Sequence, residues 1–408
     1  MTATNAIDSG NLAALVKKLY PQRRMEHLYK RGFPFLAEVK KMDDLEGSGV
    51  VVPVIHDHAS VGNSFVAAQT YRYPSTNSAF TITGITQYGV GQVDALTMMK
   101  MRNNSGGFVR AIDNEVMSVL EGMKKHTALQ LFREASGYIG VVSSISTNTI
   151  TLTNKSDVWN FHIGQFLVAA DASTGGNPRT GGDYTVTAMA PDAGTITVTS
   201  GTSCVAGDYL FNYSDESTGS TDSTGSITGM RQWIPAAAAT DTLFGVARTG
   251  KPRLYGHRVT EVALSTEDAI QEAAYKIANA CTTGGASWRC YMNPLQFRLL
   301  TYELGSKVVR DPGGLGVAGF DAIAIHTAIG KIMCVSDPAC PEDGMWLVDL
   351  DSWELHHLGE LFHIANEDSL RMLRVSDADR YEFRYRSFRQ LCCTAPVRNA
   401  YIARNTAI

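Results

Sequence analysis

One helical pattern in the sequence is longer than any other, and it runs without interruption from Gly107 to Arg133. Its apolar residues recur at steps of three and four, which places them along one stripe of a helix. They are Phe108, Ile112, Val116, Val119, Leu120, Met123 and Leu131. The opposite side carries charges, as in a helix with one buried face and not in a membrane span. These are Arg110, Asp113, Glu121, Lys124 and Lys125. A helix of about 26 residues is a rod of roughly 40 Å, and we expect this rod to be the backbone of the architecture.

The composition is that of a folded protein with several domains. A chain of 408 residues suggests two or three domains. Hydrophobic residues make up 44% and charged residues 19%, and the net charge of −4 argues against a dedicated nucleic-acid binder, whose domains are usually strongly basic. The sequence has no apolar window long enough for a transmembrane helix. Residues Met1 to Asn5 lack the features of a signal peptide.

The seven cysteines form an odd set without CxxC spacing. This pattern argues against a zinc site and against a disulfide framework, and it favours synthesis in a reducing compartment. We expect them to be small buried hydrophobic residues. They are Cys204, Cys281, Cys290, Cys334, Cys340, Cys392 and Cys393.

Residues 1–45 are predicted to form an N-terminal arm. A short amphipathic helix from about Asn11 to Leu19 is stopped by Pro21. A basic cluster comprises Lys17, Lys18, Arg23, Arg24, Lys30 and Arg31. Two interpretations remain open: the arm is simply solvated, or it reaches across a neighbouring subunit or lies on an acidic surface.

Residues 46–102 are predicted to form a long hairpin with an irregular tip. Val50–Ile55 leads out and Thr81–Val90 leads back, with β-branched residues throughout. The hairpin carries few charges, with no lysine between Met42 and Met99. Because an isolated hairpin is only marginally stable in water, we expect it to lie on another subunit.

Residues 138–228 form a β-rich segment that contains an internal duplication. Thr149–Thr153 is echoed by Thr195–Thr199, and Gly164–Leu167 is echoed by Gly207–Leu210. A repeated strand pair of this kind predicts a small two-repeat β-barrel or sandwich that is inserted as one unit. The Ser-, Thr- and Gly-rich stretch 214–229 is the expected linker back to the main body.

The inserted segment is also acidic. Lys155 and Arg179 are its only basic residues between Gly137 and Met230. Eight acids stand against them: Asp157, Asp171, Asp183, Asp192, Asp208, Asp215, Glu216 and Asp222. Because an acidic module repels phosphates, we expect it to face away from any nucleic acid.

The last part of the chain, from residue 230, has an α/β pattern. Ser265 begins a helix with acids in its first turn, and Asn293 caps a second helix over Pro294–Leu304. Short apolar strands are expected at 288–292, 322–325, 331–335 and 345–350. Tyr381–Phe388 alternates aromatic and charged residues, which predicts a long strand with one solvated face. Its arginines, with Arg380 and Arg389, could approach phosphates, but pairing with acids is the simpler expectation.

The search for catalytic chemistry yields no coherent constellation. Gly314–Gly319 matches the dinucleotide fingerprint by letter but lacks the preceding strand and following helix. His356, Glu360 and His363 would share a helix face, but a di-metal site needs further Glu ligands. His56 and His58 would point the same way from one strand and lack a third ligand. We therefore predict no catalytic, cofactor-binding or metal residues, and no enzyme.

The order of these parts resembles the major capsid protein of tailed bacteriophages, with the Hong Kong 97-type α+β fold. The resemblance implies an N-terminal arm, an E-loop hairpin, a spine helix at 103–137 in the P-domain, and an inserted β domain. It further implies a connector at 229–257, an A-domain at 258–370, which includes the Asn293–Phe297 helix start, and a P-domain strand and tail at 371–408. The missing hairpin lysine makes a covalent isopeptide crosslink improbable.

The resemblance implies a structural function without catalysis. Copies would self-assemble as hexamers and pentamers into an icosahedral shell around double-stranded DNA, with non-specific, salt-dependent phosphate contacts. A portal protein, and in some members scaffolding and decoration proteins, would be partners; a membrane would not. The location would be the virion, after assembly in the host cytoplasm. Two alternatives remain: an encapsulin-like compartment shell, or a phage decoration or binding protein.

Overall fold

The computed structural model describes residues 32–47, 49–59, 61–70, 72–96, 99, 105–173, 175–199, 203–213, 215, 225–281, 287–304, 322–365, 372–375 and 378–404. The chain divides into two compact units. The described part of the first comprises 86–127 and 357–389; the second comprises 32–85, 128–356 and 390–404. The predicted arm helix, the whole basic cluster and the glycine-rich loop at 314–319 lie outside the described residues.

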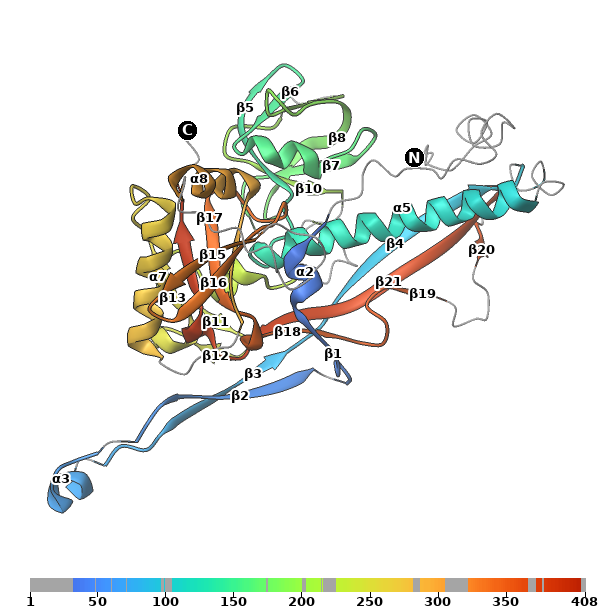
Figure 1. The fold of residues 1–408 in the computed structure, drawn as a ribbon. Helices are drawn as coiled ribbons and strands as arrows, with labels where there is room; N and C mark the ends of the chain where they lie inside the picture. The colour runs from blue at the N-terminus through green and yellow to red at the C-terminus, as the bar shows by residue number, and fades with distance from the viewer. Residues whose placement is uncertain are drawn as a thin grey trace. The chain divides into compact units, whose positions relative to one another are not determined.

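The first unit is built on long elements. Its helix is α5 (Ser105–Phe132), which confirms the predicted rod to within two residues. Its strands are β4 (Ile85–Asp94), β19 (His363–Ile364), β20 (Leu373–Arg374) and β21 (Arg380–Cys393). β21 pairs with β4, β19 and β20, and its extent confirms the predicted long strand. Figure 1 shows α5 running along β4 and β21.

Two residues of the apolar stripe of α5, Val119 and Met123, pack on β4. A Cβ atom added at Gly89 of β4 would lie 2.7 Å from Val119 and 2.6 Å from Met123. Gly91, also on β4, leaves room for the ring of Phe383 from β21. The missing side chain at Gly89 therefore lets β4 approach the helix closely.

The second unit contains the α/β domain, whose six-stranded sheet has the order β13-β22-β17-β14-β16-β15. These strands are β13 (His257–Val259), β14 (Trp288–Met292), β15 (Ala322–Thr327), β16 (Gly330–Ser336), β17 (Gly344–Asp349) and β22 (Ala400–Ala403). The helices are α7 (Thr266–Ala280) and α8 (Pro294–Leu304), both as predicted. Ser265 accepts a hydrogen bond from the Asp268 amide, and the Asn293 side chain accepts one from Leu295.

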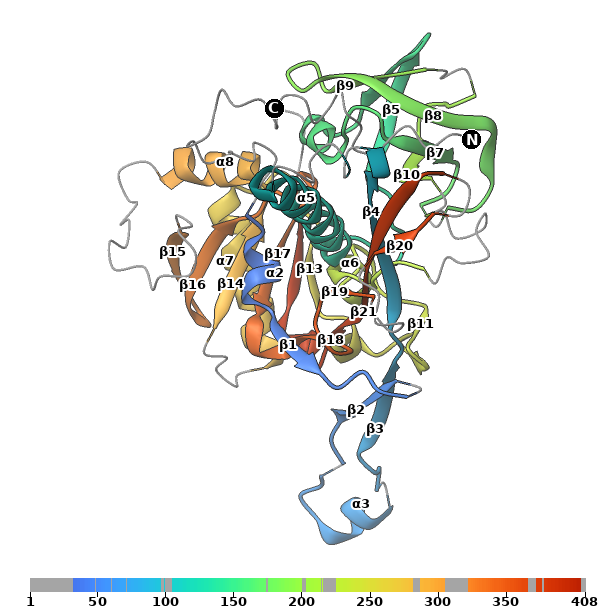
Figure 2. The same ribbon diagram turned by 90° about the vertical axis from the view of Figure 1, so that its right-hand side faces the viewer.

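The two faces of this sheet are covered differently. On one face the strands are covered by α7, which Figure 2 shows beside the sheet, and Ile270, Ala274 and Ile277 of this helix belong to the buried core with the strands. On the other face, an aromatic cluster gathers around Phe35 of α2 (Pro34–Glu38). The ring of Phe35 lies 5.2 Å from Tyr291 and 5.6 Å from Phe132, at the end of α5. The second unit therefore holds the last turn of α5 in its own core.

Smaller elements complete the second unit. They are β1 (Lys40–Asp43), α3 (Phe65–Thr70), α6 (Met230–Trp233), β11 (Thr242–Leu243), β12 (Val246–Ala247) and β18 (Trp353–His357). The 3-10 turns are η1 (Lys155–Asn160), η2 (Pro252–Leu254), η4 (Leu350–Ser352) and η5 (Pro396–Arg398).

The predicted hairpin is present, but its second strand differs from the prediction. β2 (Val50–Asp57) pairs with β3 (Thr76–Ile82), from Val50 opposite Ile82 to Asp57 opposite Thr76. The prediction of one returning strand over 81–90 is wrong, because the chain breaks at Thr83–Gly84 and β4 then pairs with β21. The hairpin proper therefore ends at Ile82.

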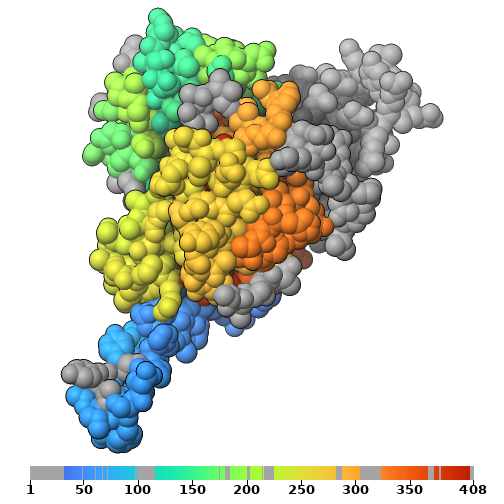
Figure 3. Space-filling view, turned by 60° about the vertical axis from the view of Figure 1, so that its left-hand side comes forward, coloured from blue at the N-terminus to red at the C-terminus, as the bar shows by residue number. Residues whose placement is uncertain are grey.

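The duplicated segment is a closed six-stranded barrel with the order β10-β5-β6-β9-β8-β7. Its strands are β5 (Gly140–Ser146), β6 (Thr149–Leu152), β7 (Phe166–Ala170), β8 (Pro178–Ala190), β9 (Thr195–Val198) and β10 (Tyr209–Asn212). Figure 3 shows it as the green lobe beside the yellow and orange α/β domain.

The two repeats pair with each other about a pseudo-two-fold axis. Ile150 of β6 lies opposite Ile196 of β9, and Val168 of β7 lies opposite Phe211 of β10. The pairs on either side of each central pair are equivalent to each other. Thr149 lies opposite Thr197 and Thr151 opposite Thr195, and likewise Leu167 lies opposite Asn212 and Ala169 opposite Leu210. Both repeats also carry a register shift at the same place, Val142/Ser144 and Val186/Ala188. The duplication that the sequence predicted is therefore present in the structure.

Candidate assembly surfaces

The hairpin exposes apolar side chains on one face and at its tip. Burial alternates along β2 and β3, and the outward positions of β2 are Val51, Pro53 and Ile55. Ile55 is 77% exposed. Around α3 at the tip, the exposed residues are Val61, Phe65, Val66 and Tyr73. Contiguous apolar exposure of this kind marks an interaction surface in a soluble protein.

The inward face of the hairpin is held firmly against its own subunit. Phe80 of β3 is fully buried, and its ring lies 5.1 Å from that of Trp233. The amide of Thr81 donates to the Phe244 carbonyl over 3.0 Å. Near the tip, Arg253 donates to the His56 carbonyl over 2.8 Å and to Asp57 Oδ1 over 2.6 Å. The outward apolar face is therefore presented in a fixed orientation.

The histidines that sequence analysis singled out do not form metal sites. His56 is buried and bonds Asp57 and Ser78, whereas His58 lies beyond the end of β2 and bonds the Ala59 carbonyl. The prediction that both point from one strand is wrong. Within the described ranges, no group of three His, Cys, Asp or Glu side chains could hold a metal ion.

The expected helix through His356, Glu360 and His363 is also wrong. His356 lies on β18 and its Nδ1 is 2.6 Å from Asp44 Oδ1. His363 lies on β19, and its Nε2 accepts a hydrogen bond from Arg386 Nε over 3.0 Å. Each imidazole bonds a partner from another segment of the chain, so the two histidines do not share a helix face.

The barrel is attached to the α/β domain through a buried ionic junction. Arg133, just past the end of α5, lies 3.3 Å from Asp157 of η1, and both side chains are buried. Burial raises the pKa of Asp157 to about 6, although the charge of Arg133 opposes this shift. Glu342 accepts a hydrogen bond from the Ser156 amide over 3.2 Å. These contacts fix the barrel at its stem.

Arg389 of β21 is a buried cation in the first unit. Its Nη2 donates to Thr127 Oγ1 over 2.8 Å and also bonds Gln87 Oε1. Its Nε and Nη1 have no hydrogen-bond partner among the described residues, and its two hydrogen-bond partners carry no charge. The guanidinium also lies over the neutral ring of Phe362, 5.7 Å from the ring centre. Burial lowers the pKa of the guanidinium to about 9, so it is still charged at neutral pH. The simpler expectation, that Arg389 pairs with an acid, is therefore wrong.

Replacing Arg389 by methionine should stabilise the protein by about 1–3 kcal/mol, because a buried charge without a counter-charge costs more than it returns. The hydroxyl of Thr127 keeps a partner after the change, since its one proton can go to Met123 O over 2.6 Å or to Gln87 Oε1 over 3.3 Å. Thermal denaturation measures the effect. Arg374→Met, on the exposed strand β20 of the same unit, is the control and should shift stability by less than about 0.5 kcal/mol, because its partner Asp379 is exposed as well. A clear fall in melting temperature for Arg389→Met would contradict this account.

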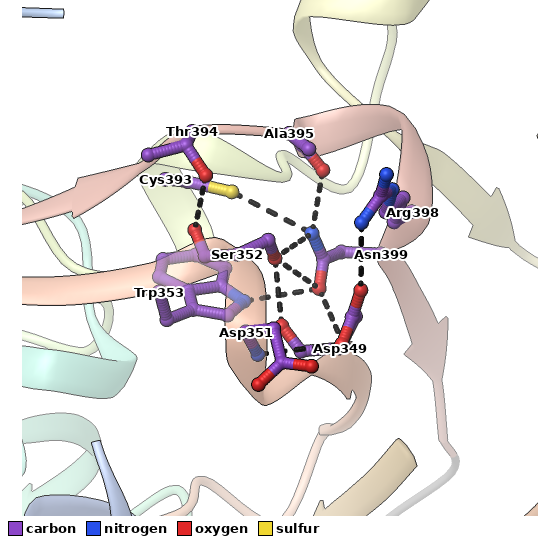
Figure 4. Close-up of polar contacts among 9 residues, drawn as sticks. All are labelled: Asp349, Asp351, Ser352, Trp353, Cys393, Thr394, Ala395, Arg398 and Asn399. Carbon is purple, nitrogen blue, oxygen red and sulfur yellow. Dashed lines mark hydrogen bonds and ion pairs between the residues drawn. The ribbon is translucent and has the colours of Figure 1, made fainter. Parts of the chain in front are cut away.

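A second buried polar cluster centres on Asn399, between η5 and β22 (Figure 4). Its Oδ1 accepts from the Asp349 amide over 2.9 Å and from Trp353 Nε1 over 3.0 Å. Its Nδ2 donates to Ser352 Oγ over 3.0 Å and to the Ala395 carbonyl over 2.9 Å. One fully buried side chain thereby joins the end of β17, the start of β18 and the turn before β22.

The fold is similar to that of phage capsid proteins. A chain of the capsid asymmetric unit of cyanophage A-1(L) aligns with a TM-score of 0.51 and 13% identity, over 96% of this chain and 98% of that one. At this identity the likeness establishes the fold alone. Residues 208–368 match the family model described as SU10 major capsid protein. These findings support a tailed-phage major capsid protein.

Two other solved structures give lower TM-scores. The capsid of an empty GTA particle aligns with this capsid protein at a TM-score of 0.48 and 10% identity, over 93% of this chain and 99% of that one. The capsid of Myoviridae phage XM1 gives 0.46 and 8%, over 98% and 100%. No curated protein matches the sequence. Within the described residues of the capsid protein, no helix is long and apolar enough to cross a membrane.

Sequence reasoning found the apolar hairpin but missed three features of the capsid protein. The anchoring of the hairpin by Arg253, the isolation of Arg389 and the network around Asn399 all depend on contacts between distant segments. Only the weak charge of residues 46–102 was visible as a signal for an assembly surface.

Proposed function

We propose that this capsid protein assembles as hexamers and pentamers into an icosahedral shell that encloses a double-stranded DNA genome. One observation carries the proposal: a hairpin anchored to its own subunit presents an apolar face and tip to the outside. A monomer gains nothing from exposing Phe65 and Val66, whereas a neighbour that covers them removes their surface from water. The proposed covering surface belongs to an adjacent copy.

The parts of the Hong Kong 97-type fold are assigned as follows in this proposal. The E-loop is the hairpin β2–β3 with its tip, and the spine helix of the P-domain is α5. The A-domain is the sheet with α7 and α8, and β21 is the returning P-domain strand. The barrel is an inserted domain. The order of these elements along the chain and the fold-level likeness to the cyanophage capsid support the assignment.

The proposed shell places the barrel away from the DNA. Between Gly137 and Met230 the sequence carries two basic residues against eight acids, and such a module repels phosphate. Contacts with DNA are then non-specific and weaken with salt. The N-terminal arm is a candidate for these contacts on its sequence alone, because it carries six basic residues between Lys17 and Arg31. Assembly takes place in the host cytoplasm with a portal protein, and scaffolding and decoration proteins are further possible partners.

Negative-stain electron microscopy of the purified chain, alone and after co-expression with the neighbouring phage structural genes, tests the shell. We expect closed particles, or rings of five and six copies. Monomers and dimers alone at high protein concentration would contradict the proposal. The compartment-shell alternative would show itself by particles that hold protein cargo and no nucleic acid.

Deleting residues 140–224 should leave a chain that still folds and assembles, at a higher protein concentration than the full chain needs. The ends of the deletion lie together, since a Cβ added at Gly137 would meet the hydroxyl of Ser226. Circular dichroism and electron microscopy measure folding and assembly. Loss of all soluble protein would show that the barrel is not an independent insertion.

A further inference from the structure

The pseudo-two-fold axis of the barrel relates two ends of the β7–β10 pair, and only one end is covered. At the covered end, Ala170 lies opposite Tyr209, and the ring of Tyr209 is 5.1 Å from that of Tyr138. The guanidinium of Arg133 lies 4.3 Å from the centre of the Tyr138 ring. An aromatic side chain backed by an arginine thus covers this end.

The other end of the same strand pair is exposed. Phe166 is the repeat equivalent of Tyr209, and the Tyr213 amide donates to the Phe166 carbonyl over 3.1 Å. Phe166 is 46% and Tyr213 49% exposed, and Ile163, three residues before Phe166, is 67% exposed. In the other repeat the position of Ile163 is Ala206. The second repeat closes its half of the barrel with alanine at this position, so folding of the barrel does not require a large apolar side chain at Ile163.

The surface formed by Ile163, Phe166 and Tyr213 is hereafter the open end. Its rim is acidic, since Asp215 follows Tyr213 and its carboxylate accepts from Asn212 Nδ2 over 3.0 Å. At the covered end, the equivalent position is covered by the ring of Tyr138 with the cation of Arg133 beside it. The internal symmetry therefore indicates that an aromatic ring with an adjacent cation would fit the open end.

The described part of this chain exposes such a pair on α8. Tyr302 is 73% exposed, and the guanidinium of the exposed Arg298 lies 5.8 Å from the centre of its ring. In the other arginine–tyrosine pairs among the described residues, the rings of Tyr138, Tyr255 and Tyr401 are buried. Since Phe166 and Tyr302 are both exposed in the same subunit, they do not cover each other within it.

We propose that the open end of the barrel docks on the Arg298–Tyr302 surface of α8 in a second copy of this chain. The apolar rings would be removed from water, and Arg298 would face the acidic rim. Two barrels are less suited to each other, because both are acidic and like charges repel across an interface. The inference rests on the proposed shell, in which copies stand side by side.

Photo-crosslinking of assembled full-length chain tests the docking. A p-benzoylphenylalanine at position 166 should link two copies, and mass spectrometry should place the link within residues 294–304 of the other copy. The control carries the probe at Val205, which is also 46% exposed but lies on the other repeat, and it should give no such link. Particles that form but link elsewhere, to another protein or not at all, would overturn the docking and leave the shell intact. Absence of particles from the unmodified chain would instead overturn the shell and the docking with it.

Substitutions give a second readout. Phe166→Ser should raise the protein concentration for half-assembly about two- to tenfold, the range for loss of one aromatic pair. Tyr302→Ser should do the same, and the double variant should add little further, whereas Val205→Ser should have no effect. If Phe166→Ser fails to fold, Tyr302→Ser on the separate α/β domain still decides the matter. Equal effects of Phe166→Ser and Val205→Ser would contradict the proposal.

Discussion

A chain whose hairpin tip has been removed should remain soluble and folded but should not form shells. The change replaces residues 58–75 by Asn-Gly, which joins the register partners Asp57 and Thr76 through a two-residue turn. It removes the four most exposed apolar side chains of the tip, Val61, Phe65, Val66 and Tyr73. Burying a large apolar side chain stabilises by about 1.5–3 kcal/mol, so the loss per copy is about 6–12 kcal/mol before the costs of association. No cooperative assembly survives a loss of that size.

Analytical ultracentrifugation and electron microscopy measure this outcome, with circular dichroism as the check on folding. The matched control removes exposed apolar side chains outside the hairpin. Val262 is 46% and Tyr275 56% exposed, and the double variant Val262→Ser/Tyr275→Ser should assemble as the unmodified chain does. Normal yields of shells from the tip-deleted chain would show that the hairpin is not the principal contact between copies.

Local signals in the sequence were sufficient where the neighbours of a residue decide its conformation. The capping serine of α7 with its acidic first turn fixed that helix, and so did the Asn-Pro start of α8. The duplicated strands also identified themselves, because Ile150 and Ile196 lie in repeated motifs that pair with each other. Apolar periodicity gave α5 its length to within two residues.

Prediction failed where the partner of a strand lies far away in the sequence. Thr81 and Ile85 stand four residues apart with the same β-branched character, yet the strands they belong to pair with different partners, β2 and β21. His356 has the spacing of a helical ligand but forms part of β18, because Asp44 is its partner across more than three hundred residues of chain. The alternation around Arg389 suggested an ion pair, and only the packing of α5 leaves that cation among neutral groups. The assembly surface was foreseen from its low charge, whereas its anchors were not.

Replacing Asn399 by alanine should destabilise the second unit by about 3–5 kcal/mol, because at least two buried donors lose their acceptor at about 1–3 kcal/mol each. The donors are the Asp349 amide and Trp353 Nε1, and the Ser352 hydroxyl and the Ala395 carbonyl lose contacts as well. Urea unfolding measures the loss. Thr249→Ala, which removes one exposed hydrogen bond to Thr240, should cost less than about 0.5 kcal/mol. A loss below about 1 kcal/mol at Asn399 would mean that the network relaxes around the cavity.

The Asn399 and hairpin variants should fail to assemble for different physical reasons. The first loses folding stability, and the second loses the surface that contacts a neighbouring copy. Asn399→Ala weakens the compact unit that also contains the hairpin's anchors, because η5 and β22 lie in the same unit as Trp233 and Arg253. Its unfolding transition should move while any folded fraction keeps a competent hairpin, so lowering the temperature should restore shells. The tip-deleted chain should show an unmoved unfolding transition and no shells at any temperature, because its contact surface is absent however stable the subunit is.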